Sequence, residues 1–202
     1  MNRQKSDNEN GHRIDAALAR AAQTGDNSAF DKLVRRHKDR IFNLCYRFLN
    51  DYQEAEDASQ DVFVKVFVAL KRFRFESTFS TWIYRITVNT CTNRLKSGSY
   101  RRRKRSTQLP DTEEKAHLAE SDELGEKSVT PADQVEKKQR MIIIKDAIES
   151  LPVKQKTLVV LRDIEGLSYE EITSITGVKS GTLKSRLARA RLNLREKLRD
   201  VI

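Results

Sequence analysis

The sequence predicts an all-α protein with two small helical domains, an N-terminal helical bundle and a C-terminal helix-turn-helix domain, joined by an acidic flexible linker. Glycine and proline are scarce, with seven and three residues in 202, as expected of a mostly helical chain. Apolar residues recur at three and four residues in two blocks. Between these blocks, residues 106–136 hold nine acids and two bases. Such a composition, without an apolar period, cannot bury a core.

The first block predicts four helices in a domain that spans residues 14–105. We expect a disordered N-terminus over residues 1–13, which are polar. Each predicted helix carries an apolar stripe at helical spacing, and Asn27-Ser28 is the expected cap of the second. The helices run from Ile14 to Ala22, Ala29 to about Leu49, Gln53 to Phe73 and Phe79 to Leu95, and a basic run follows at 101–105.

The second block, residues 137–202, predicts two helices and then a helix-turn-helix. Ser168 and Glu171 have the spacing of a capping box, and Gly177 is placed to end the first helix of the motif. Ser180 is the expected N-cap of the last helix. Its apolar stripe consists of Leu183, Leu187, Ala190, Leu194 and Leu198.

The last helix of the motif is strongly basic. From residue 179 to the end there are eight Lys/Arg and two acids. A helix-turn-helix lays its second helix in the major groove of DNA, where polar and cationic side chains contact bases and phosphates. A solvated surface helix is the alternative, but the preceding helix and turn favour DNA binding. The candidate contacts are Ser180, Thr182, Lys184, Ser185, Arg186 and Arg189.

A second candidate site interleaves aromatic and cationic residues between residues 72 and 93. Aromatic faces stack unpaired bases and arginines hold the backbone, so this composition indicates a site for single-stranded nucleic acid. For Phe79 and Trp82, whose spacing is helical, packing in the core is the favoured alternative. The candidate residues are Arg72, Arg74, Ser77, Thr78, Phe79, Trp82, Arg85 and Asn89.

A third candidate site is an acidic helix face between residues 54 and 63. Acidic faces are usually just solvated, and this one cannot bind DNA. In a chain with nucleic-acid sites elsewhere it could instead dock a basic protein partner. The candidate residues are Glu56, Asp57, Gln60, Asp61 and Phe63.

Composition excludes several other classes. The net charge of +10 favours a nucleic-acid partner, and no stretch is apolar enough for a membrane helix. We therefore expect a cytoplasmic protein with no direct membrane insertion. Cys45 and Cys91 lie in apolar patterns and the three histidines are scattered, so no metal or other cofactor is expected. No catalytic motif occurs, which argues against an enzyme.

Taken in order, the three sites resemble the extracytoplasmic-function (ECF) type of sigma factor in the sigma-70 superfamily. Residues 56–63, EDASQDVF, resemble region 2.2, and residues 79–90, FSTWIYRITVNT, resemble regions 2.3 and 2.4. Leu151-Pro152, residues 166–172 (GLSYEEI) and residues 181–191 (GTLKSRLARAR) resemble region 4. Where the family usually has a glycine-acid pair before the region 2.3 helix, this chain has Phe75-Glu76.

The resemblance implies an alternative sigma factor that directs core RNA polymerase to promoters. Region 2.2 would bind the β′ clamp helices and region 4 the β flap, with an anti-sigma factor as a further partner. Regions 2.3 and 2.4 would melt and recognise the −10 element of promoter DNA, and region 4 the −35 element. The alternative from the residues alone is a stand-alone helix-turn-helix transcription regulator, which would need neither the acidic nor the aromatic site.

Overall fold

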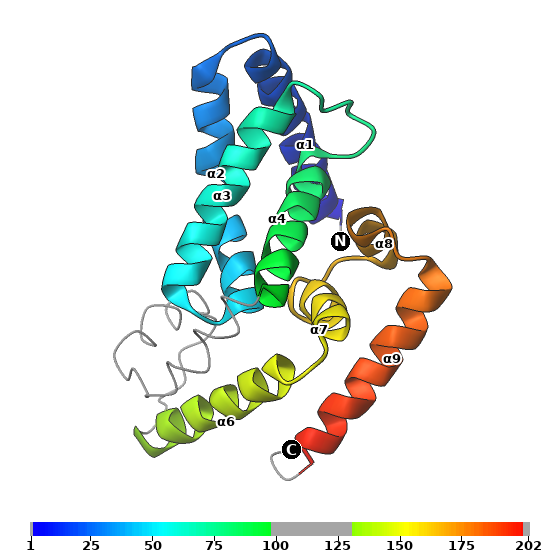
Figure 1. Cartoon of the computed structure of the whole chain (residues 1–202). Coiled ribbons are helices and arrows are strands. Elements are labelled where there is room, and N and C mark those ends of the chain that lie inside the picture. Colours follow the sequence, from blue (N-terminus) through cyan, green and yellow to red (C-terminus); the bar gives the residue numbers. More distant parts are fainter. Residues whose placement is uncertain (1, 98–130, 200–202) are drawn as a thin grey trace.

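The computed structural model describes the backbone of residues 2–97 and 131–199 and the side chains of residues 10–97 and 139–199. Within these ranges the regular elements are helices, arranged as two helical domains (Figure 1). The basic run at 101–105 and most of the predicted linker lie outside the described residues.

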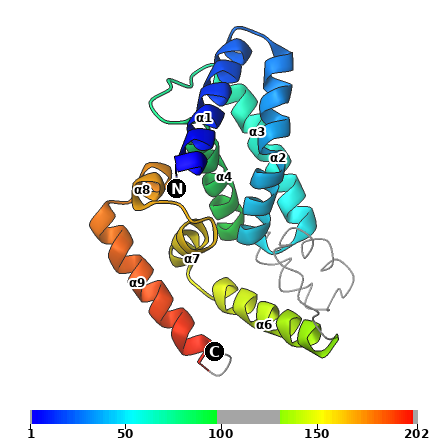
Figure 2. The same cartoon turned by 180° about the vertical axis from the view of Figure 1, so that it is seen from behind.

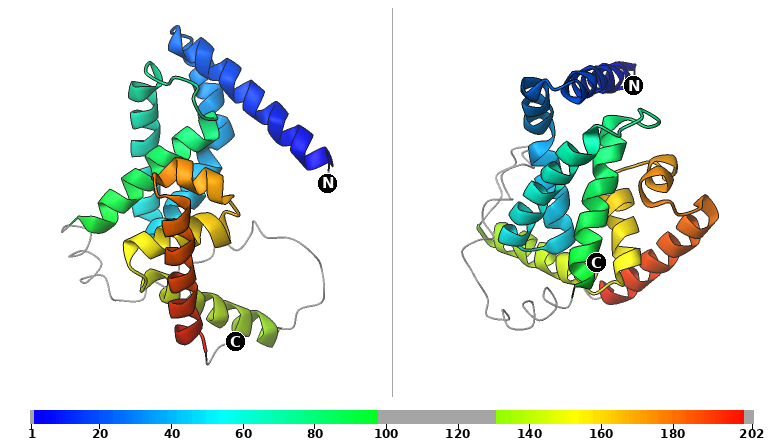
Figure 3. Two further views of the ribbon diagram at one scale, coloured as in Figure 1. Left: turned by 90° about the vertical axis from the view of Figure 1, so that its right-hand side faces the viewer. Right: turned by 45° about the horizontal axis from the view of Figure 1, so that its top comes forward.

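The first domain is a bundle of α1 (Asn2–Gln23), α2 (Asn27–Leu49), α3 (Tyr52–Leu70) and α4 (Phe79–Lys96). Helix α2 packs against the other three, and α1 lies at the edge of the bundle (Figure 3). Apolar side chains at helical spacing close the core between the helices. Its fully buried members include Leu33, Ile41, Leu44, Phe48, Val62 and Ile83.

Two N-terminal expectations for this domain were wrong. Helix α1 begins at Asn2, so residues 2–13 are helical rather than disordered. Extending a helix costs far less than nucleating one, and the packed segment that contains Ala19 supplies the nucleus. The cap of α2 is Asp26 rather than Asn27-Ser28: its carboxylate accepts a hydrogen bond from the Ala29 amide at 3.0 Å. Gly25, with φ of 103°, makes the turn that places this aspartate.

The second domain contains α6 (Pro131–Glu149), α7 (Val153–Val159), a π-helical turn η1 (Val160–Ile164), α8 (Tyr169–Thr176) and α9 (Ser180–Lys197). Helix α6 begins inside the predicted linker, with proline at the first position, where its missing N–H costs nothing. Helix α7 packs on α9, and α6 contacts both of these helices (Figure 2).

The helix-turn-helix follows its predicted local signals with one exception. Ser168 and Glu171 form the capping box, and Gly177 ends α8 with φ of 69°, which confirms both predictions. Ser180 is not the N-cap, because the backbone is already helical there and Lys179 occupies the cap without a side-chain hydrogen bond.

The two domains lie against each other. Helices α7 and α8 of the second domain contact α4 of the first (Figure 1). Buried residues of both domains, including Cys91 and Leu158, belong to one continuous apolar cluster. The helix-turn-helix therefore packs through its first helix, α8, against the helix of the second candidate site, α4.

Candidate nucleic-acid and protein-binding surfaces

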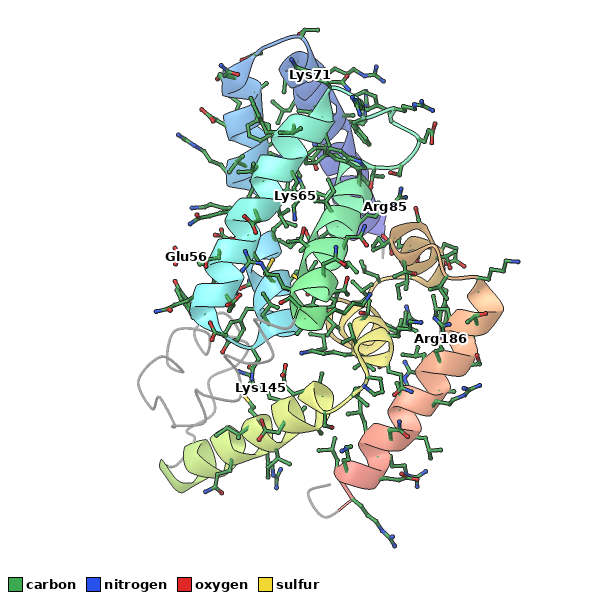
Figure 4. The ribbon with its side chains drawn as sticks, viewed as in Figure 1. Glu56, Lys65, Lys71, Arg85, Lys145 and Arg186 are labelled. Carbon is green, nitrogen blue, oxygen red and sulfur yellow. The ribbon has the colours of Figure 1, made fainter. Side chains whose placement is uncertain are left out.

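The candidate DNA-binding residues of α9 lie opposite its buried stripe. Leu183, Leu187, Ala190 and Leu198 are buried and Leu194 is partly buried, as the spacing predicted. Five of the six candidates are exposed and Arg186 is half-buried (Figure 4). The apolar stripe thus fixes the helix while its other face is open to a ligand. The exposed candidates are Ser180, Thr182, Lys184, Ser185 and Arg189.

Two other cations near this face are engaged with the protein. The Arg162 guanidinium lies 4.9 Å from the centre of the Tyr169 ring, and its Nη1 donates to the Leu167 carbonyl. Arg191 pairs with Asp163, and the hydrogen bond that its guanidinium donates to this carboxylate is the main cause that raises the pKa of Arg191. These contacts tie η1 both to the start of the motif and to α9.

The second candidate site combines the loop 71–78 with the first turns of α4. Arg72 and Arg74 are exposed, and Thr78 is the N-cap of α4, accepting a hydrogen bond from the Thr81 amide. Phe79 is only 3% exposed, so in this structure it packs in the core, the alternative that its spacing favoured. Trp82 is half-buried, with its ring stacked on Phe73 at 4.7 Å between centroids.

Phe75 gives this loop its shape. Its φ of 59° lies in the left-handed region, which a non-glycine residue enters at a cost of about 1–2 kcal/mol. The ring packs 4.6 Å from Phe73, and the Arg20 guanidinium lies 4.1 Å above it. Gln23 also donates to the carbonyls of Leu70 and Phe73 at 2.9 and 2.8 Å. Helix α1 therefore holds the loop, and Phe75 occupies a conformation that suits glycine.

Arg85 and Asn89 are exposed one turn apart on α4. Arg85 faces α8, where its guanidinium donates to the carbonyl of Ser174 at 2.8 Å (Figure 4). The structure therefore brings a predicted single-strand contact together with the helix-turn-helix. Ser77, which is half-buried, lies on the loop before α4.

The acidic candidates lie on the outer face of α3. Glu56, Asp57, Gln60 and Asp61 are exposed, and Glu56 points outward (Figure 4). Asp61 pairs with Arg94, whose guanidinium also binds Glu54 at 2.9 Å. Phe63 is half-buried and packs against the core.

Sequence reasoning missed an apolar surface on the same helix. Val64, Phe67 and Val68 are 65%, 55% and 72% exposed. Asp57, Asp61, Val64 and Val68 follow one another at four, three and four residues, so they share one stripe. Val62 and Val66 of the same helix already face the core. A second apolar stripe beside them was the sequence signal that could have revealed this surface.

No metal or membrane site emerges from the part of the chain that the structure describes. Residues 10–97 and 139–199 contain no group of three potential metal ligands, and none of the described helices could span a bilayer. Cys45 and Cys91 are free and buried, which confirms their predicted place in the core. A hydrogen bond between the thiols and burial together raise the pKa of Cys91.

Comparison with known proteins gives one consistent result. The family model of Sigma-70 region 2 matches residues 33–105, and that of Sigma-70 region 4 matches residues 138–194. The chain is 37% identical to the RNA polymerase sigma-H factor of Pseudomonas aeruginosa over 177 residues, 88% of this chain and 90% of that protein. It is 36% identical to the ECF sigma factor SigW of Bacillus subtilis over 179 residues, 88% and 92% of the two chains.

Solved structures agree on the fold. CnrH in complex with the cytosolic domain of CnrY matches with a TM-score of 0.64 at 23% identity, covering 94% of this chain and 99% of that one. The sigma factor RpoE of Bartonella quintana, in complex with the anti-sigma factor NepR, matches with a TM-score of 0.56 at 22% identity. That match covers 86% of this chain and 98% of RpoE.

Proposed function

This chain belongs to the ECF group of the sigma-70 family and is an alternative sigma factor that directs transcription initiation, and on that premise we propose which of its surfaces does what. Helix α9 binds the −35 element, the loop 71–78 with α4 opens and captures the −10 element, and α3 docks on core polymerase. The observation that carries this assignment is that one chain presents three exposed surfaces of different chemistry: basic on α9, aromatic and cationic at α4, and acidic and apolar on α3.

The assignment of α9 rests on its two faces. The apolar stripe anchors the helix to α7, and the exposed face offers hydroxyls and cations at the N-terminal end of the helix. That end is the part of a recognition helix that contacts base edges. The guanidinium groups of Arg186 and Arg189 can donate to guanine edges or to phosphates. The shorter hydroxyl side chains of Thr182 and Ser185 can contact base edges or phosphates that lie closer to the helix.

The assignment of the −10 site rests on the arrangement of the 71–78 loop. Extruding bases from duplex DNA costs a few kcal/mol for each step, so capture of the opened strand must offset this cost. The Trp82 ring is half-buried and thus partly accessible for stacking, and Arg72 and Arg74 are exposed on the loop. Phe79 supports Trp82 from the core at 5.8 Å between centroids. We therefore assign Phe79 a supporting role and Trp82 the stacking role.

The assignment of α3 to polymerase docking rests on its mixed chemistry. Protein interfaces have an apolar centre with a polar rim, and Val64, Phe67 and Val68 supply the apolar part. Glu56, Asp57 and Asp61 supply an acidic rim that complements a basic partner. We propose that this surface binds the β′ clamp helices.

Helix α6 offers a second docking surface. Its residues Met141, Ile142, Ile143 and Ile144 are between 39% and 51% exposed, and exposed apolar clusters mark protein contacts. We assign this surface to the β flap. An anti-sigma factor would cover one or both docking surfaces, as RpoE of Bartonella quintana is bound by NepR. We place the chain in the cytoplasm with polymerase and assign it no catalytic step.

The experiment that tests this function is transcription in vitro with purified core polymerase. Transcripts made from genomic templates with and without this chain are sequenced, and the regions upstream of their starts are aligned. We expect start sites that depend on the chain and share two conserved elements. If no template yields such transcripts, the assignment fails. Tight duplex binding by the chain without polymerase would instead support a stand-alone regulator.

A further inference from the structure

The chain enters the helix-turn-helix through a π-helical turn. In η1 the Glu165 amide donates to the Val160 carbonyl, five residues back, at 2.9 Å. A π turn is wider than an α-helical turn, is rare, and occurs frequently at functional sites. Gly166, with φ of 69°, follows it, and the Leu167 amide donates to the Leu161 carbonyl at 3.0 Å. Hydrogen bonds therefore fix the backbone that leads into α8.

Two neighbouring residues of η1 contact different helices of the motif. The Asp163 carboxylate accepts hydrogen bonds from Nε and Nη2 of Arg191 on α9. Arg162 contacts the start of α8 instead: its Nη1 donates to the Leu167 carbonyl at 2.7 Å, and its guanidinium lies 4.9 Å from the centre of the Tyr169 ring. A bidentate pair of arginine and carboxylate fixes orientation as well as distance. The turn thus holds both helices of the motif.

The Tyr169 ring also receives a cation from the recognition helix. Nζ of Lys184 on α9 lies 5.9 Å from the centre of this ring, and Lys184 is exposed while Tyr169 is half-buried. The negative face of an aromatic ring attracts a cation within about 6 Å. Two cations repel each other, and here the ring and the carbonyl that accepts from Arg162 offset this repulsion.

The contact lies where both helices of the motif approach DNA. Lys184 is the fifth residue of α9 and Tyr169 is the first of α8. In a helix-turn-helix the first helix crosses the DNA backbone and the N-terminal part of the second enters the major groove. A lysine at this place can reach a phosphate. Immobilising such a long side chain on binding weakens affinity by a factor of about two to ten.

We propose that Tyr169 is a positioning residue for −35 binding, which acts through Lys184 and is itself held by Arg162. The ring restricts the lysine before DNA binds, so less side-chain freedom is lost in the complex. Tyr169 itself needs no contact with DNA. The proposal rests on the proposed function of α9, whereas the contact between Tyr169 and Lys184 in the free chain does not.

The contact is tested first, by NMR of the free full-length chain. Lysine protons that lie over an aromatic ring are shifted upfield, and we expect such a shift for the Lys184 side chain. Tyr169→Leu should abolish it, Tyr169→Phe should keep it, and Arg162→Met should reduce it. If Tyr169→Leu left the Lys184 signals in place, the contact would be overturned.

DNA binding is then tested with holoenzyme, formed from core polymerase and the full-length chain. The probe is a duplex promoter fragment recovered by transcript sequencing, and its affinity is measured at several salt concentrations and at a temperature that keeps the DNA closed. Tyr169→Leu should weaken binding about twofold to tenfold, and Tyr169→Phe should bind like the parent. A fragment with a scrambled −35 element shows whether the parent depends on that element.

A double-mutant cycle separates positioning from packing, because Tyr169 also packs against the apolar core. Lys184→Ala should weaken binding and lower the salt slope by about one. In that background Tyr169→Leu and Arg162→Met should have little further effect, whereas a packing role predicts the same loss in both backgrounds.

Three outcomes of the cycle would overturn the proposal. They are an equal loss from Tyr169→Leu in both backgrounds, a gain of affinity in Tyr169→Leu, and an unchanged affinity in Lys184→Ala. If instead the parent binds the intact and the scrambled fragments equally, the proposed function of α9 fails, while the NMR signals still decide the contact.

Discussion

Replacing Asp15 by alanine should detach α1 and loosen the candidate −10 site without touching a DNA contact. Asp15 is 3% exposed and its carboxylate joins α1 to α2. Oδ1 accepts from Arg36 Nε at 2.8 Å and Oδ2 lies 3.0 Å from His37 Nε2. A buried ring nitrogen left without its partner costs about 1–3 kcal/mol. The Arg36 pair is 39% exposed on the arginine side and adds only about 0.2–1 kcal/mol, for a total of roughly 1–4 kcal/mol.

The effect should reach the 71–78 loop, because Arg20 and Gln23 of α1 hold that loop. Hydrogen exchange in the full chain should therefore speed up in α1 and in the loop, with little change in α9. Asp31→Ala, which removes an exposed acid from α2, is the matched control. If exchange in α1 matched that of the control, the reasoning from Asp15 would be refuted.

The contribution of Asp15 should also depend on pH. Burial would raise the pKa of Asp15, but hydrogen bonds from His37 and Arg36 outweigh it and leave the pKa below the ordinary 3.8. A lowered pKa in the folded state means that the stabilisation is fully present above 3.8 and is lost as the pH falls through the folded value. Urea titrations of the parent and Asp15→Ala should differ at pH 7 and converge in acid. A difference that persisted at low pH would contradict this assignment.

Three further predictions concern the other surfaces. Gly177→Ala should cost about 1 kcal/mol of unfolding free energy because φ is 69° there with open space around the new methyl group, whereas Gly181→Ala, inside α9, should be neutral or stabilising in the same urea titration. Val68→Asp should leave the melting temperature unchanged and weaken core polymerase binding about tenfold or more, measured by fluorescence anisotropy, and unchanged affinity would remove α3 from the interface. Arg189→Ala or Arg186→Ala should weaken −35 use by about 1–3 kcal/mol, and an unaltered promoter profile in transcript sequencing would contradict their assignment.

The features predicted correctly from the sequence are local ones. The capping box of Ser168 and Glu171, the helix stop at Gly177 and the buried stripe of α9 each depend on residues three or four positions apart. Such signals are complete within one turn of helix. Such short signals do not fix a helix end to the residue. At Asp26 and Ser180 the predicted caps were wrong by one position, because several adjacent residues could each occupy the cap.

The features missed depend on contacts that span the chain. Lys156 and Glu165 are charged residues, which are ordinarily exposed, yet their side chains are buried against the first domain. Lys156 donates to the Phe48 carbonyl and Glu165 pairs with Arg47, 108 and 118 residues away in the sequence. Nothing in their neighbourhood indicates that another domain will bury them. Phe79 illustrates the reverse case, since an aromatic residue in a basic segment suits both a core and a stacking site, and only the packing around Phe73 and Trp82 decides between them.

The positive φ of Phe75 bears on whether the matched region 2 segment can work without helix α1. The matched region 2 begins at residue 33, but two of the side chains that hold this loop, Arg20 and Gln23, come from α1, which precedes it. A glycine at this position would adopt the left-handed backbone without help, and a segment cut at residue 33 would then keep the loop conformation. In this chain the loop conformation depends in part on contacts from outside the matched segment. Promoter opening in this chain should therefore be a property of the domain together with its leading helix, and grafting the matched segment alone into another sigma factor should transfer the residues without their geometry.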